Sequence, residues 1–110
     1  KKFYWLLISS NNKMLLKRND SKGICKSLWL FPGKDILSKD NISLLEKKES
    51  LPEIIHNLSH RKLNISTVKY QIKNKDRLKI DRSSSIWVSK ADSVKMGMPK
   101  PIKEIIKNYL

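Results

Sequence analysis

One segment of the sequence combines side-chain types that suit contact with a nucleotide. It holds an apolar side chain, a hydroxyl, an imidazole and two cations, in the order Leu58, Ser59, His60, Arg61 and Lys62. Cations position a protein on phosphate groups, whereas a polar side chain at a loop tip can read the edge of a base. Because the segment lies between two apolar stretches, we predict that it forms the tip of a β-hairpin. An ordinary polar hairpin turn remains an alternative interpretation.

The acidic residues do not predict a catalytic site. Only Glu46, Glu49 and Glu53 lie near one another, at a spacing that would share one face of a continuing helix. Pro52 argues against that continuation. Since a magnesium site needs well-placed carboxylates together with a phosphate, a solvated charged surface is the expected role of these three residues.

Other signatures of chemistry are also missing from the sequence. The three glycines are isolated, so there is no phosphate-binding glycine loop, and no GxSxG nucleophile motif occurs. Cys25 is the one cysteine, and it can form neither an internal disulfide nor a metal site by itself. His56 and His60 have no further ligand nearby. We therefore predict no catalytic residue, no metal and no cofactor in this chain.

The charge of the chain favours a polyanionic partner. Twenty-four basic residues stand against 10 acidic residues, which gives a formal net charge of +14. Such a field attracts nucleic acid first of all. Lysine greatly outnumbers arginine, as an AT-rich coding genome would produce, so codon bias remains a competing explanation for part of the charge.

The length sets the domain organisation. A chain of 110 residues is one domain's worth of sequence, and we expect residues 1–110 to form a single domain. The first residue is Lys1 rather than Met, which predicts a domain of a longer chain. No stretch resembles a membrane span or a signal peptide, so no membrane partner is expected.

Hydrophobic periodicity predicts an α+β fold, with strands as its main elements. Phe3–Ser9 is expected to be a strand buried on both faces, and the turn at Ser10–Lys13 joins it to a second strand at Met14–Lys17. Leu63–Ile72 is expected to be a long strand whose apolar phase changes at Ser66–Thr67, which predicts a β-bulge there. Further strand segments are Ser27–Phe31, Leu78–Asp81 and Ile86–Ser89.

Two helices are predicted. Ser38 can cap a helix over Lys39–Lys48. Pro101 suits the first turn of a C-terminal helix, whose apolar stripe follows helical spacing at Ile102, Ile105, Ile106 and Tyr109. Together with the strands, these helices predict a sheet that is mixed or antiparallel and covered by helices.

Three motifs in succession resemble one protein family. They are Lys22-Gly23-Ile24 with Leu28-Trp29-Leu30-Phe31-Pro32, then Leu58-Ser59-His60 with Leu63-Asn64-Ile65, and finally Met96-Gly97-Met98-Pro99-Lys100-Pro101-Ile102. In this order they resemble the C-terminal domain of the bacterial adenine DNA glycosylase family, MutY. The resemblance covers nearly the whole chain and implies a Nudix-like fold, with a mixed β-sheet flanked by helices and a C-terminal helix.

The resemblance also implies a function in base excision repair. In this family the C-terminal domain recognises 8-oxoguanine paired with adenine in double-stranded DNA. An N-terminal domain of the same chain, which usually carries a 4Fe-4S cluster, excises the adenine. The implied location is the cytoplasm of a bacterium, at the nucleoid. Ser59 matches the family's base-reading serine and His60 its histidine, and Arg61 follows them, whereas Leu58 replaces the usual Phe and can wedge into a stack but not stack as a ring.

Two other functions stay open on the sequence. One is a divergent Nudix pyrophosphatase that acts on oxidised nucleotides, although the GX5EX7REUXEEXGU pattern of such hydrolases is missing here. The other is a basic module that binds RNA or a protein without preference for damaged DNA.

Overall fold

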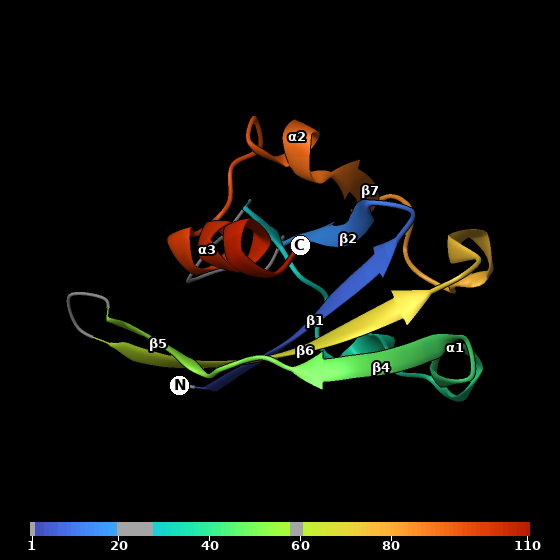
Figure 1. Cartoon of the computed structure of the whole chain (residues 1–110), viewed down its shortest axis with the longest axis horizontal. Coiled ribbons are helices and arrows are strands. Elements are labelled where there is room, and N and C mark those ends of the chain that lie inside the picture. Colours follow the sequence, from blue (N-terminus) through green and yellow to red (C-terminus); the bar gives the residue numbers. More distant parts are fainter. Residues whose placement is uncertain (1, 20–27, 58–60) are drawn as a thin grey trace.

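Two long central strands organise the sheet of the computed structural model, which describes residues 2–19, 28–57 and 61–110 (Figure 1). Strands β1 (Lys2–Ser10) and β6 (Lys62–Ile72) run parallel, from the pair Lys2 and Asn64 to the pair Ser9 and Gln71. The seven-stranded mixed sheet follows the order β3-β2-β1-β6-β4, while β5 pairs with β6 and β7 pairs with β2. The remaining strands are β2 (Lys13–Arg18), β3 (Trp29–Leu30), β4 (Leu45–Ser50), β5 (Ile54–Asn57) and β7 (Ser85–Ser89).

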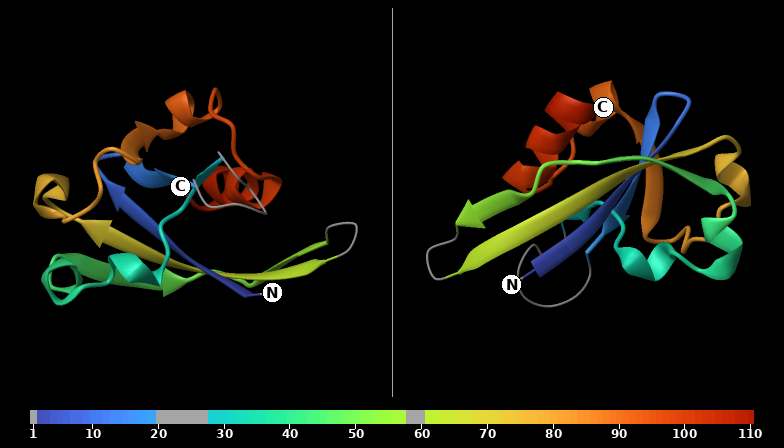
Figure 2. Two further views of the ribbon diagram at one scale, coloured as in Figure 1. Left: turned by 180° about the vertical axis from the view of Figure 1, so that it is seen from behind. Right: turned by 60° about the horizontal axis from the view of Figure 1, so that its bottom comes forward.

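Helices cover the two faces of this sheet (Figure 2). Helix α3 (Lys100–Tyr109) packs on one face through its buried residues Pro101, Ile102, Ile105 and Ile106, which confirms the predicted C-terminal helix. Helix α2 (Lys90–Ser93) follows β7 directly. The 3-10 turn η1 (Lys34–Ile36) and helix α1 (Lys39–Ile42) lie on the opposite face. No helix in the described part of the chain is long and apolar enough to cross a membrane.

Each face of the sheet carries its own hydrophobic core. The α3-side core contains Trp5, Leu7, Met14, Leu16, Phe31, Leu63, Ile65 and the isoleucines of α3. The α1-side core is smaller and contains Leu6, Ile8, Leu15, Ile72 and Leu78. Successive residues of one strand alternate between the two cores, as the pleat of a strand requires.

Strand β1 confirms only part of the predicted burial on both faces. Residues Trp5–Ile8 are buried, and none of them exceeds 5% exposure. Tyr4 precedes them on the same strand and is 48% exposed. The α1-side core therefore ends before it reaches the first residues of β1, and one face of the sheet is open there.

The β-bulge predicted at Ser66–Thr67 is wrong. Strand β6 pairs with β1 in an unbroken register from Asn64 to Gln71. The apolar phase changes because the first half of β6 packs into the α3-side core and its end packs into the α1-side core through Ile72. A bulge does occur in the adjacent strand, where the register of β4 shifts between Lys47 and Glu49.

The helix predicted over Lys39–Lys48 is also corrected, because α1 ends at Ile42 and the chain continues into strand β4. Ser38 caps the helix as predicted and accepts a hydrogen bond from the Asn41 backbone N–H. No apolar stripe of helical spacing extends beyond α1. Leu44 and Leu45 instead pack against the α1-side core, and β4 pairs with β6.

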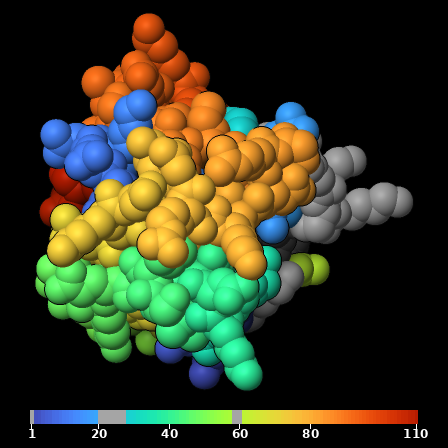
Figure 3. Space-filling view, turned by 90° about the vertical axis from the view of Figure 1, so that its right-hand side faces the viewer, coloured from blue at the N-terminus to red at the C-terminus, as the bar shows by residue number. Residues whose placement is uncertain are grey.

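The buried side chain of Asn41 explains why Leu78–Asp81 is not a strand. Its amide donates to the carbonyl oxygens of Ile36 at 2.9 Å and Lys79 at 2.8 Å, and its oxygen accepts from the Lys79 N–H at 2.8 Å. The Asn41 side chain therefore forms hydrogen bonds with the backbone N–H and carbonyl oxygen of Lys79, which a neighbouring strand would otherwise pair with. Figure 3 shows the result at this end of the molecule, where segment 73–82 lies against segment 34–48.

The turn after β1 follows the sequence prediction. Asn11 and Asn12 have φ angles of 49° and 65°, in the left-handed region that asparagine tolerates. They join β1 to the antiparallel strand β2. Strand β7, after η2 (Lys75–Arg77), confirms the predicted Ile86–Ser89 strand.

Candidate nucleic-acid interface

The segment that combines hydroxyl, imidazole and cations connects two paired strands. β5 and β6 are antiparallel, and their last described pair joins Asn57 to Lys62. The antiparallel pairing of the two strands that the hairpin prediction requires is therefore confirmed. Leu58, Ser59 and His60 lie outside the described residues, whereas Arg61 is described and exposed to solvent.

The base of the hairpin is fixed by the α3-side core. Leu63 and Ile65 of β6 are 3% and 1% exposed, and Ile54 of β5 packs against the same core. Just before β5, the Leu51 N–H donates to the carbonyl oxygen of Thr67 at 2.9 Å. The strands then extend away from the helices, so the hairpin projects from the body of the molecule (Figure 1).

Two of the three sequence motifs support the hairpin from within the core. Trp29 and Gly97 come from the first and third motifs, and the Trp29 N–H donates to the Gly97 carbonyl oxygen at 2.9 Å. Phe31 and Met98 are 3% and 7% exposed and belong to the same core as Leu63. In the described residues, Trp29, Phe31 and Met98 of these two motifs therefore act in packing.

An open, polar sheet face continues from the hairpin. Paired residues of adjacent strands point to the same side of a sheet, and the register joins Asn57 to Lys62, Ile55 to Asn64, and Lys2 to Asn64. We call these residues, with Tyr4, the hairpin face: Lys2, Tyr4, Ile55, Asn57, Lys62 and Asn64. Ile55 is 55% exposed and Tyr4 48% exposed.

Cations and an aromatic ring meet at this face. The Lys34 ammonium lies 3.8 Å from the centre of the Tyr4 ring, within the range of a cation–π contact. Cations, amides and an exposed ring are the side chains that contact phosphates and unpaired bases. Sequence analysis missed Tyr4 and Lys2 because it predicted a strand buried on both faces. The alternation of Lys2 and Tyr4 with apolar Phe3 and Trp5 was the available signal.

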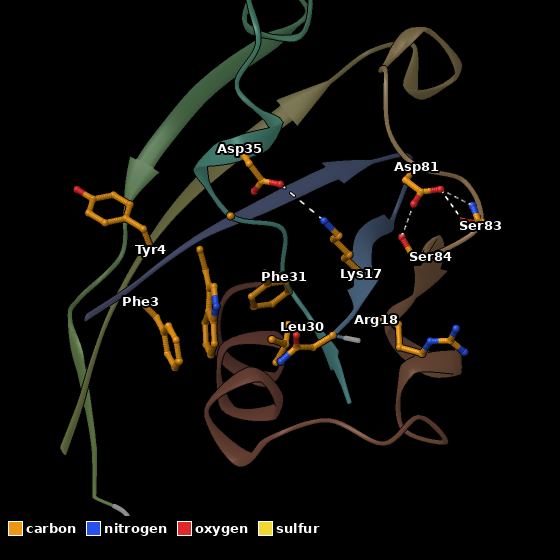
Figure 4. Close-up of a pocket in the computed structure, with 13 residues that line it drawn as sticks. Phe3, Tyr4, Lys17, Arg18, Leu30, Phe31, Asp35, Asp81, Ser83 and Ser84 are labelled. Carbon is orange, nitrogen blue, oxygen red and sulfur yellow. Dashed lines mark hydrogen bonds and ion pairs between the residues drawn. The ribbon is translucent and has the colours of Figure 1, made fainter. Parts of the chain in front are cut away.

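A second candidate site is a cavity of about 720 Å³ between β1, β2 and the segment 81–84 (Figure 4). Phe3, Trp5 and Phe31 form its aromatic wall. Trp5 packs edge-on against Phe31 with ring centres 6.0 Å apart, and it stacks on Phe3 at 5.9 Å. These rings belong to the α3-side core or pack against it.

The two carboxylates of this cavity already have partners. Asp35 forms an ion pair with Lys17 at 3.6 Å. Asp81 accepts hydrogen bonds from the Ser83 hydroxyl at 2.6 Å, from the Ser83 N–H at 3.0 Å and from the Ser84 hydroxyl at 3.1 Å. These bonds, the Ser83 hydroxyl first among them, hold the pKa of Asp81 below its ordinary value.

The described residues contain no group of three or more His, Cys, Asp or Glu side chains that could hold a metal ion. Asp40 of α1 does not line the cavity, and the hydrogen bond from Lys79 lowers its pKa. Across the described chain, the geometry therefore offers an exposed basic hairpin and a cavity whose two carboxylates are held by an ion pair and by internal hydrogen bonds.

The model for the NUDIX domain matches residues 3–108. The chain belongs to the NUDIX domain family. Two curated relatives of this NUDIX domain are adenine DNA glycosylases from Buchnera aphidicola. The protein from subspecies Baizongia pistaciae is 31% identical over 111 residues, which cover 96% of this chain and 31% of that protein. The protein from subspecies Schizaphis graminum is 25% identical over 116 residues, which cover 99% of this chain and 33% of that protein.

The NUDIX domain thus spans about a third of the length of the curated relatives that it matches. Their names confirm the resemblance to adenine DNA glycosylases that the three motifs indicate.

Solved structures share the fold. The C-terminal domain of mouse MUTYH, solved in complex with human PCNA, superposes with a TM-score of 0.73 at 13% identity, covering 98% of this chain and 86% of that one. The Ap4A hydrolase of C. elegans also gives a TM-score of 0.73, at 10% identity, and covers 96% of this chain and 92% of that one. The predicted Nudix-like mixed sheet with a C-terminal helix is confirmed by these superpositions.

Proposed function

We propose that this NUDIX domain is the lesion-recognition module of an A/G-specific adenine DNA glycosylase. It holds 8-oxoguanine opposite adenine in duplex DNA during base excision repair, and the β5–β6 hairpin makes the contact. The observation that carries the proposal is that the two strands joined by residues 58–61 pair with each other and are anchored in the α3-side core, with Arg61 and Lys62 exposed beside the segment that contains Ser59 and His60 in the sequence. The names of the Buchnera relatives support it independently.

The proposed base contact follows from the chemistry of the lesion. Oxidised guanine carries a hydrogen on N7 and an oxygen on C8, so N7 becomes a donor and C8 gains an acceptor. The Ser59 hydroxyl can accept from N7–H or donate to the C8 oxygen, because a hydroxyl does both. Normal guanine offers only a lone pair at N7. The loss of one such hydrogen bond is worth about 1–3 kcal/mol.

The positive charge of the domain supplies the part of the DNA affinity that does not depend on the DNA sequence. The formal charge of +14 draws the domain to the phosphate backbone, and each phosphate neutralised adds about −0.9 to the slope of log K against log salt. Arg61 and Lys62 directly follow the tip on the β6 side and are exposed, so they are well placed to hold phosphates next to the lesion.

In this proposal the adenine is excised by another domain of the same protein. A 4Fe-4S cluster needs about four cysteine ligands. The chain has one cysteine, so any cluster of the whole protein is held elsewhere. The proposed partners of the module are the lesion-bearing duplex and that N-terminal glycosylase domain, in the cytoplasm of a bacterium at the nucleoid.

The test is the Ser59→Ala variant of the full-length protein. We expect its affinity for a duplex with 8-oxoguanine opposite adenine to fall several-fold, while its affinity for the unmodified duplex stays nearly constant, as measured by fluorescence anisotropy. Ser59→Thr keeps a hydroxyl and should retain the preference. Ser43→Ala, at the opposite end of the sheet, is the matched control and should change neither affinity. Equal loss on both duplexes would refute base recognition by Ser59.

The aromatic cavity favours a second candidate, a pyrophosphatase for oxidised nucleotides, since flat rings suit a purine base. Incubation with 8-oxo-dGTP and Mg²⁺ separates the two functions. We expect no monophosphate to form, because the chain lacks the GX5EX7REUXEEXGU pattern and the described residues contain no group of three or more potential metal ligands. A generic basic module would instead show equal affinity for damaged and undamaged duplexes.

A further inference from the structure

A shallow groove between α2 and α3 has an apolar floor and lysine walls. Its volume is about 370 Å³. Met98 and Ile106 form the floor and are 7% and 5% exposed, while Val94 stands at one side and is 75% exposed. Val94 is therefore an apolar side chain that the fold itself leaves largely uncovered.

The walls of the groove are held in place by hydrogen bonds. The Lys90 ammonium, from α2, donates to the carbonyl oxygens of Lys107 and Leu110 at 3.3 Å each, at the C-terminal end of α3. The Ser89 hydroxyl caps α2 by accepting from the Asp92 N–H, and the Ser93 hydroxyl donates to the Lys90 carbonyl at 2.6 Å. The groove is thus formed before any partner arrives, which lowers the entropic cost of binding.

The charges around the groove favour a partner with negative charge. Every ionisable residue that lines it is a lysine: Lys90, Lys103 and Lys107. Lys103 and Lys107 are exposed on successive turns of α3, on the same side of the helix. Their ammonium groups are therefore available to carboxylates that pass along the groove.

The groove lies away from the hairpin face. Helix α3 packs on the side of the sheet that holds Leu63 and Ile65, whereas Lys2, Tyr4 and Asn64 belong to the opposite side of the same strands. DNA on the hairpin face leaves the groove free. An apolar floor also gives nothing to a phosphate backbone, so a second nucleic-acid contact does not explain the groove.

We propose that this groove docks an acidic amphipathic segment of a partner protein. The apolar side chains of the segment would pack on Val94, Met98 and Ile106, and its carboxylates would face Lys103 and Lys107. This is recognition of a helix in a groove, in which apolar anchors give affinity and the rim charges give selectivity.

The probe is a fluorescent peptide of about 16 residues with Leu at helical spacing and Glu between, a design that follows the anchor spacing of groove-bound helices. A scrambled peptide of the same composition measures non-specific attraction to the basic protein. We expect the patterned peptide to bind at least about tenfold more tightly than the scrambled one. Equal binding of the two peptides would overturn the proposal.

Two variants locate the binding. Val94→Asp places a carboxylate on the apolar side of the groove at an exposed position, so the fold should persist, as unfolding in urea would verify. We expect patterned-peptide affinity to fall about tenfold or more in Val94→Asp and in Lys103→Glu. Ile42→Asp, at a 55% exposed apolar residue of α1, and Lys73→Glu are the matched controls and should leave it unchanged. If the controls lose as much affinity as the groove variants, or if Val94→Asp loses none, the groove is not the site.

Discussion

The two halves of the central strand pair differ in how they are covered. In the half that contains Leu6 and Ile8, both faces of the sheet are packed, one against α3 and its neighbours and the other against the segments around α1. In the half that begins at Lys2 and continues into the hairpin, only the α3 side is packed, and Tyr4 and Ile55 stay exposed. The same two strands therefore provide stability at one end and an open surface at the other.

This difference indicates where recognition is possible in the domain. A sheet covered on both faces has no open face for a ligand, whereas a sheet covered on one face can offer the other. In the aromatic cavity, the carboxylates that could contact a ligand already interact with Lys17 and with the serines at 83 and 84. The hairpin half keeps its polar groups on the outside.

The largest expected effect comes from two substitutions on one face of β1. Ile8 is 0% exposed, and Ile8→Ala should lower the free energy of unfolding by about 2–5 kcal/mol through lost burial and a cavity. Tyr4→Ala lies on the same face in the open half and should cost well below about 1 kcal/mol. Urea denaturation measures both. Similar losses for the two variants would show that the open half is packed in solution.

Asn41→Ala tests the covering of the stable half from the α1 side. The change leaves the carbonyls of Ile36 and Lys79 and the Lys79 N–H without their partner. We expect a loss of about 1–3 kcal/mol in the free energy of unfolding, because unpaired buried polar groups are costly. DNA affinity below the unfolding transition should not change. A parallel loss of DNA affinity would mean that the two halves are coupled.

A smaller effect is expected from the cations of the open half. The double variant Arg61→Ala, Lys62→Ala should reduce the salt slope of DNA binding by about 0.9 for each phosphate that the protein no longer neutralises. Lys73→Ala, just beyond the other end of β6, is the matched control and should leave the slope as it is. Anisotropy titrations across a range of salt concentrations give the slopes. An equal change in the control would assign the charge effect to the whole surface.

The smallest effect is a dependence of stability on acid pH. The pKa of Asp81 is lowered by hydrogen bonds from Ser83 and Ser84, and that of Asp40 by Lys79. An unfolded aspartate titrates near about 3.9. The folded pKa is lower, so this stabilisation is present above about pH 4 and is lost as the pH falls through the folded pKa.

Asp81→Asn should therefore flatten the acid side of the stability profile, measured by thermal unfolding between acid and neutral pH. Because Asp81 lies outside the hairpin face, binding of the lesion duplex at neutral pH should stay unchanged. An unchanged acid profile would show that the Ser83 and Ser84 hydrogen bonds do not persist in solution.

Local patterns predict much of this fold. The asparagines at 11 and 12, the isoleucine spacing of α3 and the Ser38 cap each depend on neighbours in sequence, and all three are observed. The predictions are wrong where contacts with segments distant in the sequence determine the local structure. The helix expected as far as Lys48 stops because its continuation pairs with β6, and Leu78–Asp81 is not a strand because Asn41 takes its backbone groups.

The candidate site also has a part that the local sequence predicts and a part that depends on the pairing of distant strands. The pairing of β5 with β6 is predictable because the segment around residues 58–62 lies between two apolar stretches, and the motif in that segment contributes to the family resemblance. The alternation of Lys2 and Tyr4 with Phe3 and Trp5 indicates that one face of β1 is polar at its start, but only the pairing of β1 with β6 places Lys2 beside Asn64. The phase change in β6 wrongly predicts a bulge for a similar reason. The sequence of one strand does not show that its two faces pack into two different cores.

The bulge in β4 bears on how this protein avoids self-association. β4 is an edge strand that pairs only with β6 among the described strands. The backbone groups on the outer side of an edge strand can pair with a strand of another chain. Its sequence there is Glu46, Lys47, Lys48 and Glu49, and the register breaks within that run. Charge and irregularity together make this edge of the sheet a poor surface for the addition of a strand from another chain.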